Sequence, residues 1–102
     1  PIPRGILSTI YVTLANDWSL PEMHDLYAET YNHEPFIDVL PSGQLATIAH
    51  VVNSNKCAIS LSKAGQTLII TSAIDTLLKG AAGQALQNMN VVYGLEETLG
   101  LK

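Results

Sequence analysis

The sequence has 102 residues, 47% of them hydrophobic and 14% charged, a composition that predicts one folded domain and excludes a disordered chain. Nine acidic and five scattered basic residues give a formal charge of −4, which disfavours a nucleic-acid partner because a phosphate backbone requires clustered cations. The single cysteine excludes an internal disulfide, and no hydrophobic run exceeds three residues, so we expect a cytoplasmic protein without a membrane partner.

The N-terminus begins with Pro1-Ile2-Pro3-Arg4 and carries no initiator methionine before the first strand pattern. A piece of a longer protein has this appearance, and so does a proteolytically processed chain. We expect a piece of a longer protein.

The first part of the chain predicts a strand, a helix and a second strand. Residues 5–14 alternate between two faces with many β-branched members, which is typical of a strand. Ser19 and Glu22 have the spacing of a capping box and predict the start of a helix. The apolar stripe of this helix is Met23, Leu26, Tyr27 and Tyr31. Pro35 prevents the helix from continuing, and residues 36–40 predict a short strand.

The second part predicts a hairpin followed by a long helix. Residues 57–74 alternate on both sides of a turn at Gly65, which is typical of two antiparallel strands. Asp75 or Thr76 is expected to cap the last helix, and Gly94 is expected to end it. The stripe predicted to face inward on this helix is Leu78, Ala82, Ala85, Met89 and Val92.

These elements together predict an α+β fold over a single domain, residues 1–102. The hairpin favours a largely antiparallel mixed sheet, and we expect both helices to pack on one face of it. Ala58, Ser60 and Ser62 form a small, flat hairpin surface through which two copies are expected to associate.

Two glycines near the start of the last helix are the first candidate for a binding site. Gly80 and Gly83 each cost about 1 kcal/mol relative to alanine inside a helix, so something is expected to approach the backbone closely there. Tight helix–sheet packing and a ligand at the helix start both remain open. The spacing lacks the second glycine of the dinucleotide fingerprint, and the chain is too short for a Rossmann domain of its own.

Few other residues have the spacing of a reactive site. Arg4 lies on stiff backbone beside Pro3 and can present a bidentate fork to an anion, although terminal arginines usually point into solvent. Cys57 leads an apolar strand and is expected to be buried and inert. His24 and His33 have no partner at a metal-ligand spacing, so no metal site is predicted.

Three segments and the tail resemble the N-acetyl-γ-glutamyl-phosphate reductases, and the resemblance covers nearly the whole chain. The segments are residues 1–9 (PIPRGILST), 50–57 (HVVNSNKC), 72–90 (SAIDTLLKGAAGQALQNMN) and 94–101 (GLEETLGL). The run from Lys79 to Asn90 is the most specific of them. Three residues depart from the family's pattern. Ile2 replaces methionine, which conserves volume, and Asn53 stands where the family has glycine and is expected to tolerate the turn. Lys56 replaces an aromatic residue, which puts a packing contact there in doubt.

The resemblance implies a fold like the C-terminal catalytic and dimerisation domain of glyceraldehyde-3-phosphate dehydrogenase. It implies a parent enzyme that reduces N-acetylglutamyl phosphate to N-acetylglutamate semialdehyde with NADPH in arginine biosynthesis, and that forms a homo-oligomer through the sheet. The family's nucleophilic cysteine, its acid/base histidine and its Rossmann domain would lie upstream of residue 1, so the chain alone is expected to be inactive, with no catalytic residue of its own.

The same resemblance implies two binding roles within the chain. Arg4 would hold the anionic substrate, and Gly80, Gly83 and Gln84 would face the nicotinamide end of NADP, with Gln84 in the place of an asparagine of the related aspartate-semialdehyde dehydrogenases. An independent small α+β interaction module without a catalytic role remains the alternative.

Overall fold

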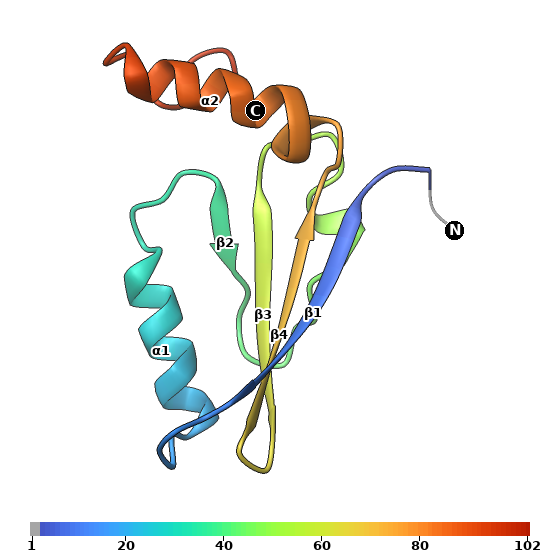
Figure 1. Cartoon of the computed structure of the whole chain (residues 1–102), viewed down its shortest axis with the longest axis vertical. Coiled ribbons are helices and arrows are strands. Elements are labelled where there is room, and N and C mark those ends of the chain that lie inside the picture. The colour runs from blue at the N-terminus through green and yellow to red at the C-terminus, as the bar shows by residue number, and fades with distance from the viewer. Residues whose placement is uncertain (1–2) are drawn as a thin grey trace.

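The computed structural model describes residues 3–102, so the expectations for Pro1 and Ile2 lie outside the described residues. Within that range the chain forms β1 (Ile6–Thr13), α1 (Leu20–Thr30), β2 (Ile37–Val39), η1 (Ile48–His50), β3 (Cys57–Ala64), β4 (Thr67–Ile74), η2 (Leu78–Ala82) and α2 (Gly83–Val92) (Figure 1). The architecture is α+β, as the sequence predicts. No helix of residues 3–102 is long and apolar enough to span a bilayer.

One mixed, largely antiparallel sheet joins the strands in the order β1-β4-β3-β2. β4 pairs antiparallel with both β1 and β3, and β2 adds to β3 in parallel. The β3–β4 hairpin forms where its alternation predicts it, and Gly65 at the turn has a φ of +60°, which favours glycine. The predicted strand and hairpin are therefore confirmed.

Helix α1 starts as its sequence predicts and covers one face of the sheet. The Ser19 hydroxyl accepts the Glu22 amide at 3.2 Å, and the Glu22 carboxylate accepts the Ser19 amide at 3.4 Å, which completes the capping box. Met23 is buried in a cluster with Leu14 and Leu68. These apolar contacts hold α1 against the sheet.

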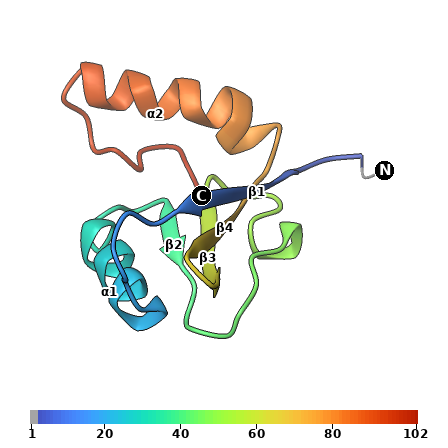
Figure 2. The same ribbon diagram turned by 60° about the horizontal axis from the view of Figure 1, so that its bottom comes forward.

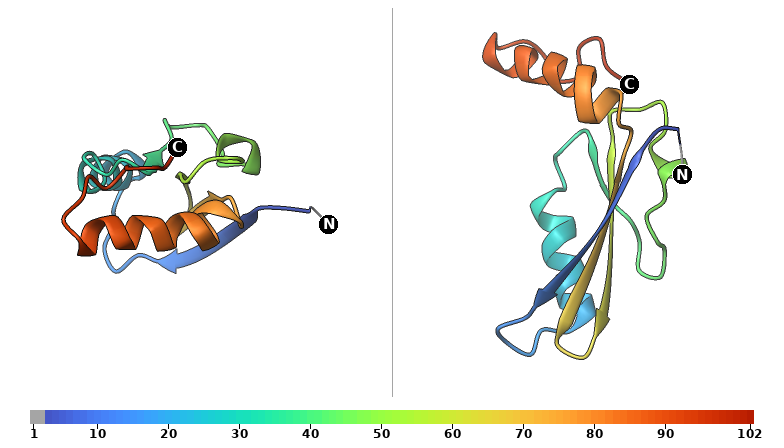
Figure 3. Two further views of the ribbon diagram at one scale, coloured as in Figure 1. Left: turned by 90° about the horizontal axis from the view of Figure 1, so that it is seen from above. Right: turned by 45° about the vertical axis from the view of Figure 1, so that its right-hand side comes forward.

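The opposite face is covered by residues 45–52, which include η1 (Figure 3). Ala46 and Val51 pack on Ala58 and Ala73, which face each other across β3 and β4. The Ser60 hydroxyl accepts the Ala46 amide at 2.9 Å. The prediction that Ala58 and Ser60 contact a second copy is therefore wrong. These two side chains are small, so residues 45–52 of the same chain pack against them and cover them.

The edge strand β1 carries the exposed apolar surface of the sheet. Successive residues point to opposite faces, so Leu7 and Tyr11 lie on one face and Ile10 on the other. Their exposed fractions are 53%, 69% and 46%. Apolar surface of this extent on both faces of an edge strand is typical of a contact region.

Helix α2 departs from two predictions. It crosses the end of the sheet beyond the strand tips, whereas we expected both helices on one face (Figure 1). The predicted inward stripe is also wrong, because Ala82, Ala85, Met89 and Val92 are exposed and Gly83 and Asn90 are buried. The physical reason is η2, in which the Gly80 amide donates to the Asp75 carbonyl and the Ala82 amide to the Leu77 carbonyl. The backbone is kinked within it at Ala81, whose φ of −145° and ψ of −107° are not helical, so α2 does not continue the turn before it.

The tail after α2 folds back beneath the helix and returns to the sheet (Figure 2). Gly94 ends the helix with a φ of +69°, as predicted. The buried Asn90 side chain then donates from Nδ2 to the carbonyls of Glu97 and Leu99, both at 3.0 Å. The Asn90 carboxamide and the Gln87 side chain, which donates to Glu97 Oε2 at 2.6 Å, thus fix the tail under α2.

Candidate functional site

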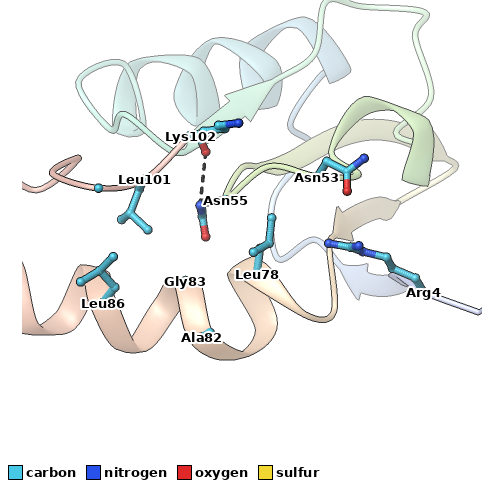
Figure 4. Close-up of a pocket in the computed structure, with 10 residues that line it drawn as sticks. Arg4, Asn53, Asn55, Leu78, Ala82, Gly83, Leu86, Leu101 and Lys102 are labelled. Atoms are coloured by element: carbon cyan, nitrogen blue, oxygen red, sulfur yellow. Dashed lines mark hydrogen bonds between the residues drawn. The ribbon is translucent and has the colours of Figure 1, made fainter.

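A cavity of about 730 Å³ lies where the N-terminal segment, the turn before β3, the start of α2 and the tail meet. Figure 4 shows the side chains that line it. They are Arg4, Asn53, Asn55, Leu78, Ala82, Gly83, Leu86, Gly100, Leu101 and Lys102. The sequence distance between these segments is large, so the cavity exists only in the folded chain.

Asp75, at the end of β4, organises the polar side of this cavity. Its side chain is fully buried. Oδ2 accepts Arg4 Nε and the Asn53 amide, each at 2.8 Å, and Oδ1 accepts the amides of Leu77 and Leu78 at 2.9 and 3.2 Å. Of the two residues expected to cap the last helix, it is therefore Asp75 that accepts the first amides after β4. Asp75 also binds Arg4 and Asn53, which belong to segments distant in the sequence.

Burial alone would raise the pKa of Asp75, but the hydrogen bonds from Arg4 and from three backbone amides outweigh it and lower the pKa from 3.8 to about 2. The carboxylate is therefore charged throughout the neutral range. Because the folded pKa lies below the unfolded one, the stabilisation is present above pH 3.8 and is lost as the pH falls toward 2.

Arg4 is held at the cavity rather than pointing freely into solvent. Its Nε is engaged by Asp75, and 30% of its side chain remains exposed. The next amide, of Gly5, donates to Thr76 Oγ1 at 2.7 Å. Gly5 itself has a φ of +108°, and a Cβ there would lie 2.7 Å from the Ile48 side chain, so only glycine fits beside Arg4.

Asn53 and Asn55 form the turn on the other side of the cavity. Asn53 adopts a left-handed conformation with a φ of +63°, so the expectation that asparagine tolerates this turn is confirmed. The Asn55 amide and its Nδ2 both donate to the Lys102 carbonyl, at 2.9 and 3.3 Å (Figure 4). Its Oδ1 is buried without a hydrogen-bond partner among residues 3–102 and points at Gly83.

The two glycines of the predicted cofactor site differ in what surrounds them. A Cβ on Gly83 would lie 1.6 Å from Asn55 Oδ1 and 2.7 Å from the Leu78 carbonyl, so packing within the chain requires a glycine there. A Cβ on Gly80 would meet its nearest atom at 3.4 Å, an ordinary contact, so packing does not require Gly80. Gly80 is exposed, and Gln84 is half-buried and donates to Asn88 Oδ1 at 2.8 Å.

The remaining reactive side chains have structural surroundings. Cys57 Sγ lies 3.4 Å from Ser72 Oγ and is half-buried rather than fully buried as expected. His24 Nε2 bonds the Leu40 carbonyl at 2.8 Å, which ties α1 to the end of β2. In the part of the chain that the structure describes, no group of three or more histidine, cysteine or acidic side chains could hold a metal ion.

Comparison with known proteins decides the family. The model of the semialdehyde dehydrogenase dimerisation domain matches residues 1–76. This chain belongs to the semialdehyde dehydrogenase dimerisation domains. Their description agrees with the exposed apolar strand β1.

Curated relatives carry a more specific name. The N-acetyl-gamma-glutamyl-phosphate reductase of Geobacter metallireducens is 54% identical over 104 residues, which cover 100% of this chain and 30% of the relative. The reductase of Cellvibrio japonicus is 47% identical and that of Clostridium kluyveri 48%, each over 103 residues, 99% of this chain and 30% of the relative. The chain thus spans about 30% of the length of the curated relatives it matches.

Sequence reasoning identified Arg4 and Gly83, which the fold brings to one cavity, and missed their partners. Gly80 and Gln84 do not line the cavity. Asp75 was expected only as a helix cap, and Asn55 was not singled out. The signal for Asp75 was an aspartate that ends a buried strand directly before a helix start, a position from which one oxygen remains available after capping.

Proposed function

We propose that this dimerisation domain works as the C-terminal part of an NADPH-dependent reductase that converts N-acetylglutamyl phosphate to N-acetylglutamate semialdehyde in arginine biosynthesis, in the cytoplasm. The observation that carries the proposal is identity of about half the residues, over the whole chain, to reductases of that name. Phosphate departs from the acyl carbon in this reaction and a hydride from NADPH takes its place.

Arg4 is proposed to bind the anionic substrate. Three observations support this role: its position at the cavity, its partly exposed side chain, and the rigid attachment of its Nε to Asp75. A guanidinium so held keeps its terminal nitrogens for a carboxylate or phosphate, which it can bind through two parallel hydrogen bonds.

Gly80, Gly83 and Gln84 are proposed to face the nicotinamide end of NADP. Gly80 supports this role best, because its missing side chain has no packing explanation in residues 3–102 and leaves the backbone open to a flat ring. Gln84 donates to Asn88 through Nε2, and its Oε1 remains available to accept a hydrogen bond from a carboxamide. Gly83 lies close to Gly80 and Gln84 in the sequence, although its contact with Asn55 is already sufficient to require a glycine there.

The protein is proposed to form a homo-oligomer through the sheet. The family description names dimerisation, and the exposed apolar residues of β1 supply the surface. A two-fold pair would bury Tyr11 and Leu7 of both copies. The chain by itself is proposed to be inactive, since its cysteine lies beside Ser72 and not at the cavity.

The reverse reaction of the full-length protein tests this function. Purified enzyme with N-acetylglutamate semialdehyde, phosphate and NADP⁺ is expected to produce NADPH, seen by absorbance, and the 102-residue chain is expected to produce none. Turnover with NAD⁺ in place of NADP⁺ is the cofactor control. An inactive full-length protein that still associates into dimers would favour an interaction module instead.

Gln84→Ala tests the cofactor site in the same assay. Loss of one neutral hydrogen bond is worth about 1 kcal/mol, so the KM for NADP⁺ is expected to rise about fivefold. Gln87→Ala is the matched control, because Gln87 lies one turn away and bonds Lys79 and Glu97 within the chain. An unchanged KM in Gln84→Ala would remove Gln84 from the cofactor site.

A further inference from the structure

Asp75 joins three segments that meet at the cavity. Arg4 belongs to the chain before β1, Asn53 to the turn before β3, and the amides of Leu77 and Leu78 to the first turn after β4. We propose that Asp75 is the positioning residue for Arg4, and that it aims the free edge of the guanidinium at a substrate oxyanion. This inference rests on the proposed reductase function.

The two carboxylate oxygens of Asp75 accept hydrogen bonds from different segments of the chain. Oδ1 accepts two amides at the helix start, and Oδ2 accepts Arg4 Nε and the Asn53 amide. Each oxygen thus accepts two N–H groups, so Asp75 accepts one hydrogen bond from Arg4 and has no oxygen left to accept another from its Nη groups. Among residues 3–102 no acceptor bonds the terminal Nη groups, so the edge that carries them remains for a ligand.

The burial of the pair supports the same geometry. Asp75 is fully buried and Arg4 is 30% exposed, so the inner end of the ion pair is immobile and the outer end reaches the cavity. A flexible arginine loses about 2 kcal/mol of side-chain entropy when a substrate orders it. Contact with Asp75 orders Arg4 before the substrate arrives, which favours tighter binding.

The left-handed Asn53 strengthens the arrangement. Its φ of +63° turns the backbone amide toward Asp75 Oδ2, so this oxygen is held from a second side. Thr76 holds the Gly5 amide at 2.7 Å, which fixes the backbone on which Arg4 stands. Both contacts limit the positions that the guanidinium can adopt.

The ligand chemistry is an oxyanion that matches a planar pair of N–H donors. A phosphate and a carboxylate both fit this edge, and the proposed substrate contains both. The reverse reaction separates the two, because phosphate and the carboxylate-bearing semialdehyde are then different substrates with different KM values.

A double-mutant cycle in the full-length enzyme tests the inference. Asp75→Ser and Asp75→Asn retain a side-chain oxygen for the amides of Leu77 and Leu78 but remove the charged acceptor of Arg4. Each is expected to raise about tenfold the KM of one anionic substrate, phosphate or semialdehyde, and to leave the KM of NADP⁺ unchanged. In an Arg4→Ala background the same change is expected to add less than twofold.

Asp38→Asn is the matched control, since its ion pair with Lys56 at 3.2 Å lies on the exposed surface. Its KM values are expected to match those of wild type. The inference would be overturned if the Asp75 and Arg4 changes raised the KM independently, so that their separate fold-changes multiply in the double variant. It would also be overturned by an equal rise in the KM of NADP⁺, or by an Asp75→Ser protein that does not fold. An inactive wild-type enzyme would overturn the proposed function together with this inference, whereas an active one with multiplying effects overturns the inference alone.

Discussion

The two helices are held by opposite kinds of interaction. Helix α1 packs through apolar side chains, with Met23 against Leu14 and Leu68, and its start is capped by its own residues. Helix α2 is held by polar groups: Asp75 accepts the amides at the start of the turn η2 that leads into it, its first residue Gly83 contacts Asn55, and Asn90 near its end donates to the tail. A helix fixed in the second way can carry a polar site, because Gly83 and Asn55 line the cavity and Asp75 binds Arg4 at it.

Gly83→Val should have the largest effect on the α2 side of this comparison. A Cβ there would overlap Asn55 Oδ1 and the Leu78 carbonyl, so the helix must move away from the turn before β3. We expect a loss of about 3 kcal/mol in unfolding free energy, measured by thermal or urea denaturation of the purified protein. Gly80→Ala is the control and should change stability by less than about 1 kcal/mol, since its nearest contact is ordinary. Equal stability of wild type and Gly83→Val would refute the packing of Gly83 on Asn55.

Met23→Ala tests the apolar attachment of α1. Met23 is buried among Leu14 and Leu68, and truncation should leave a cavity that costs about 2–3 kcal/mol of unfolding free energy. Leu26→Ala, on the same helix but 48% exposed, should cost less than about 1 kcal/mol. Similar losses in the two variants would mean that α1 is not held by the face that carries Met23.

Asn90→Ala tests the polar attachment of the tail. The carbonyls of Glu97 and Leu99 would each lose their donor, which should cost about 2 kcal/mol in total. Hydrogen exchange should quicken in residues 95–102 and stay unchanged in β3 and β4. Asn88→Ala, at an exposed position two residues earlier, is the control. Unaltered exchange in the tail of Asn90→Ala would contradict the assigned role.

The difference between the helices also explains what the sequence predicts well. Helix α1, the strands and the hairpin follow from neighbouring residues, such as the pair Ser19 and Glu22 and the alternation around Gly65, so local patterns were sufficient. The phase of α2 was mispredicted because the backbone kinks at Ala81 within η2, and the local pattern of apolar residues does not mark this kink. The contact of Arg4 with Asp75 spans 71 positions of sequence, beyond the reach of any periodicity.

Kinetics of Arg4→Lys in the full-length enzyme test most directly the central claim, that the polar groups holding α2 also hold a substrate-binding arginine. Lysine keeps the charge but loses the planar pair of donors, so the KM of phosphate or semialdehyde should rise about tenfold while the KM of NADP⁺ stays the same. The midpoint of thermal unfolding, measured alongside, should fall only slightly, because lysine can still reach Asp75. An unchanged kcat/KM for both anionic substrates would contradict the claim and leave Arg4 as a structural partner of Asp75.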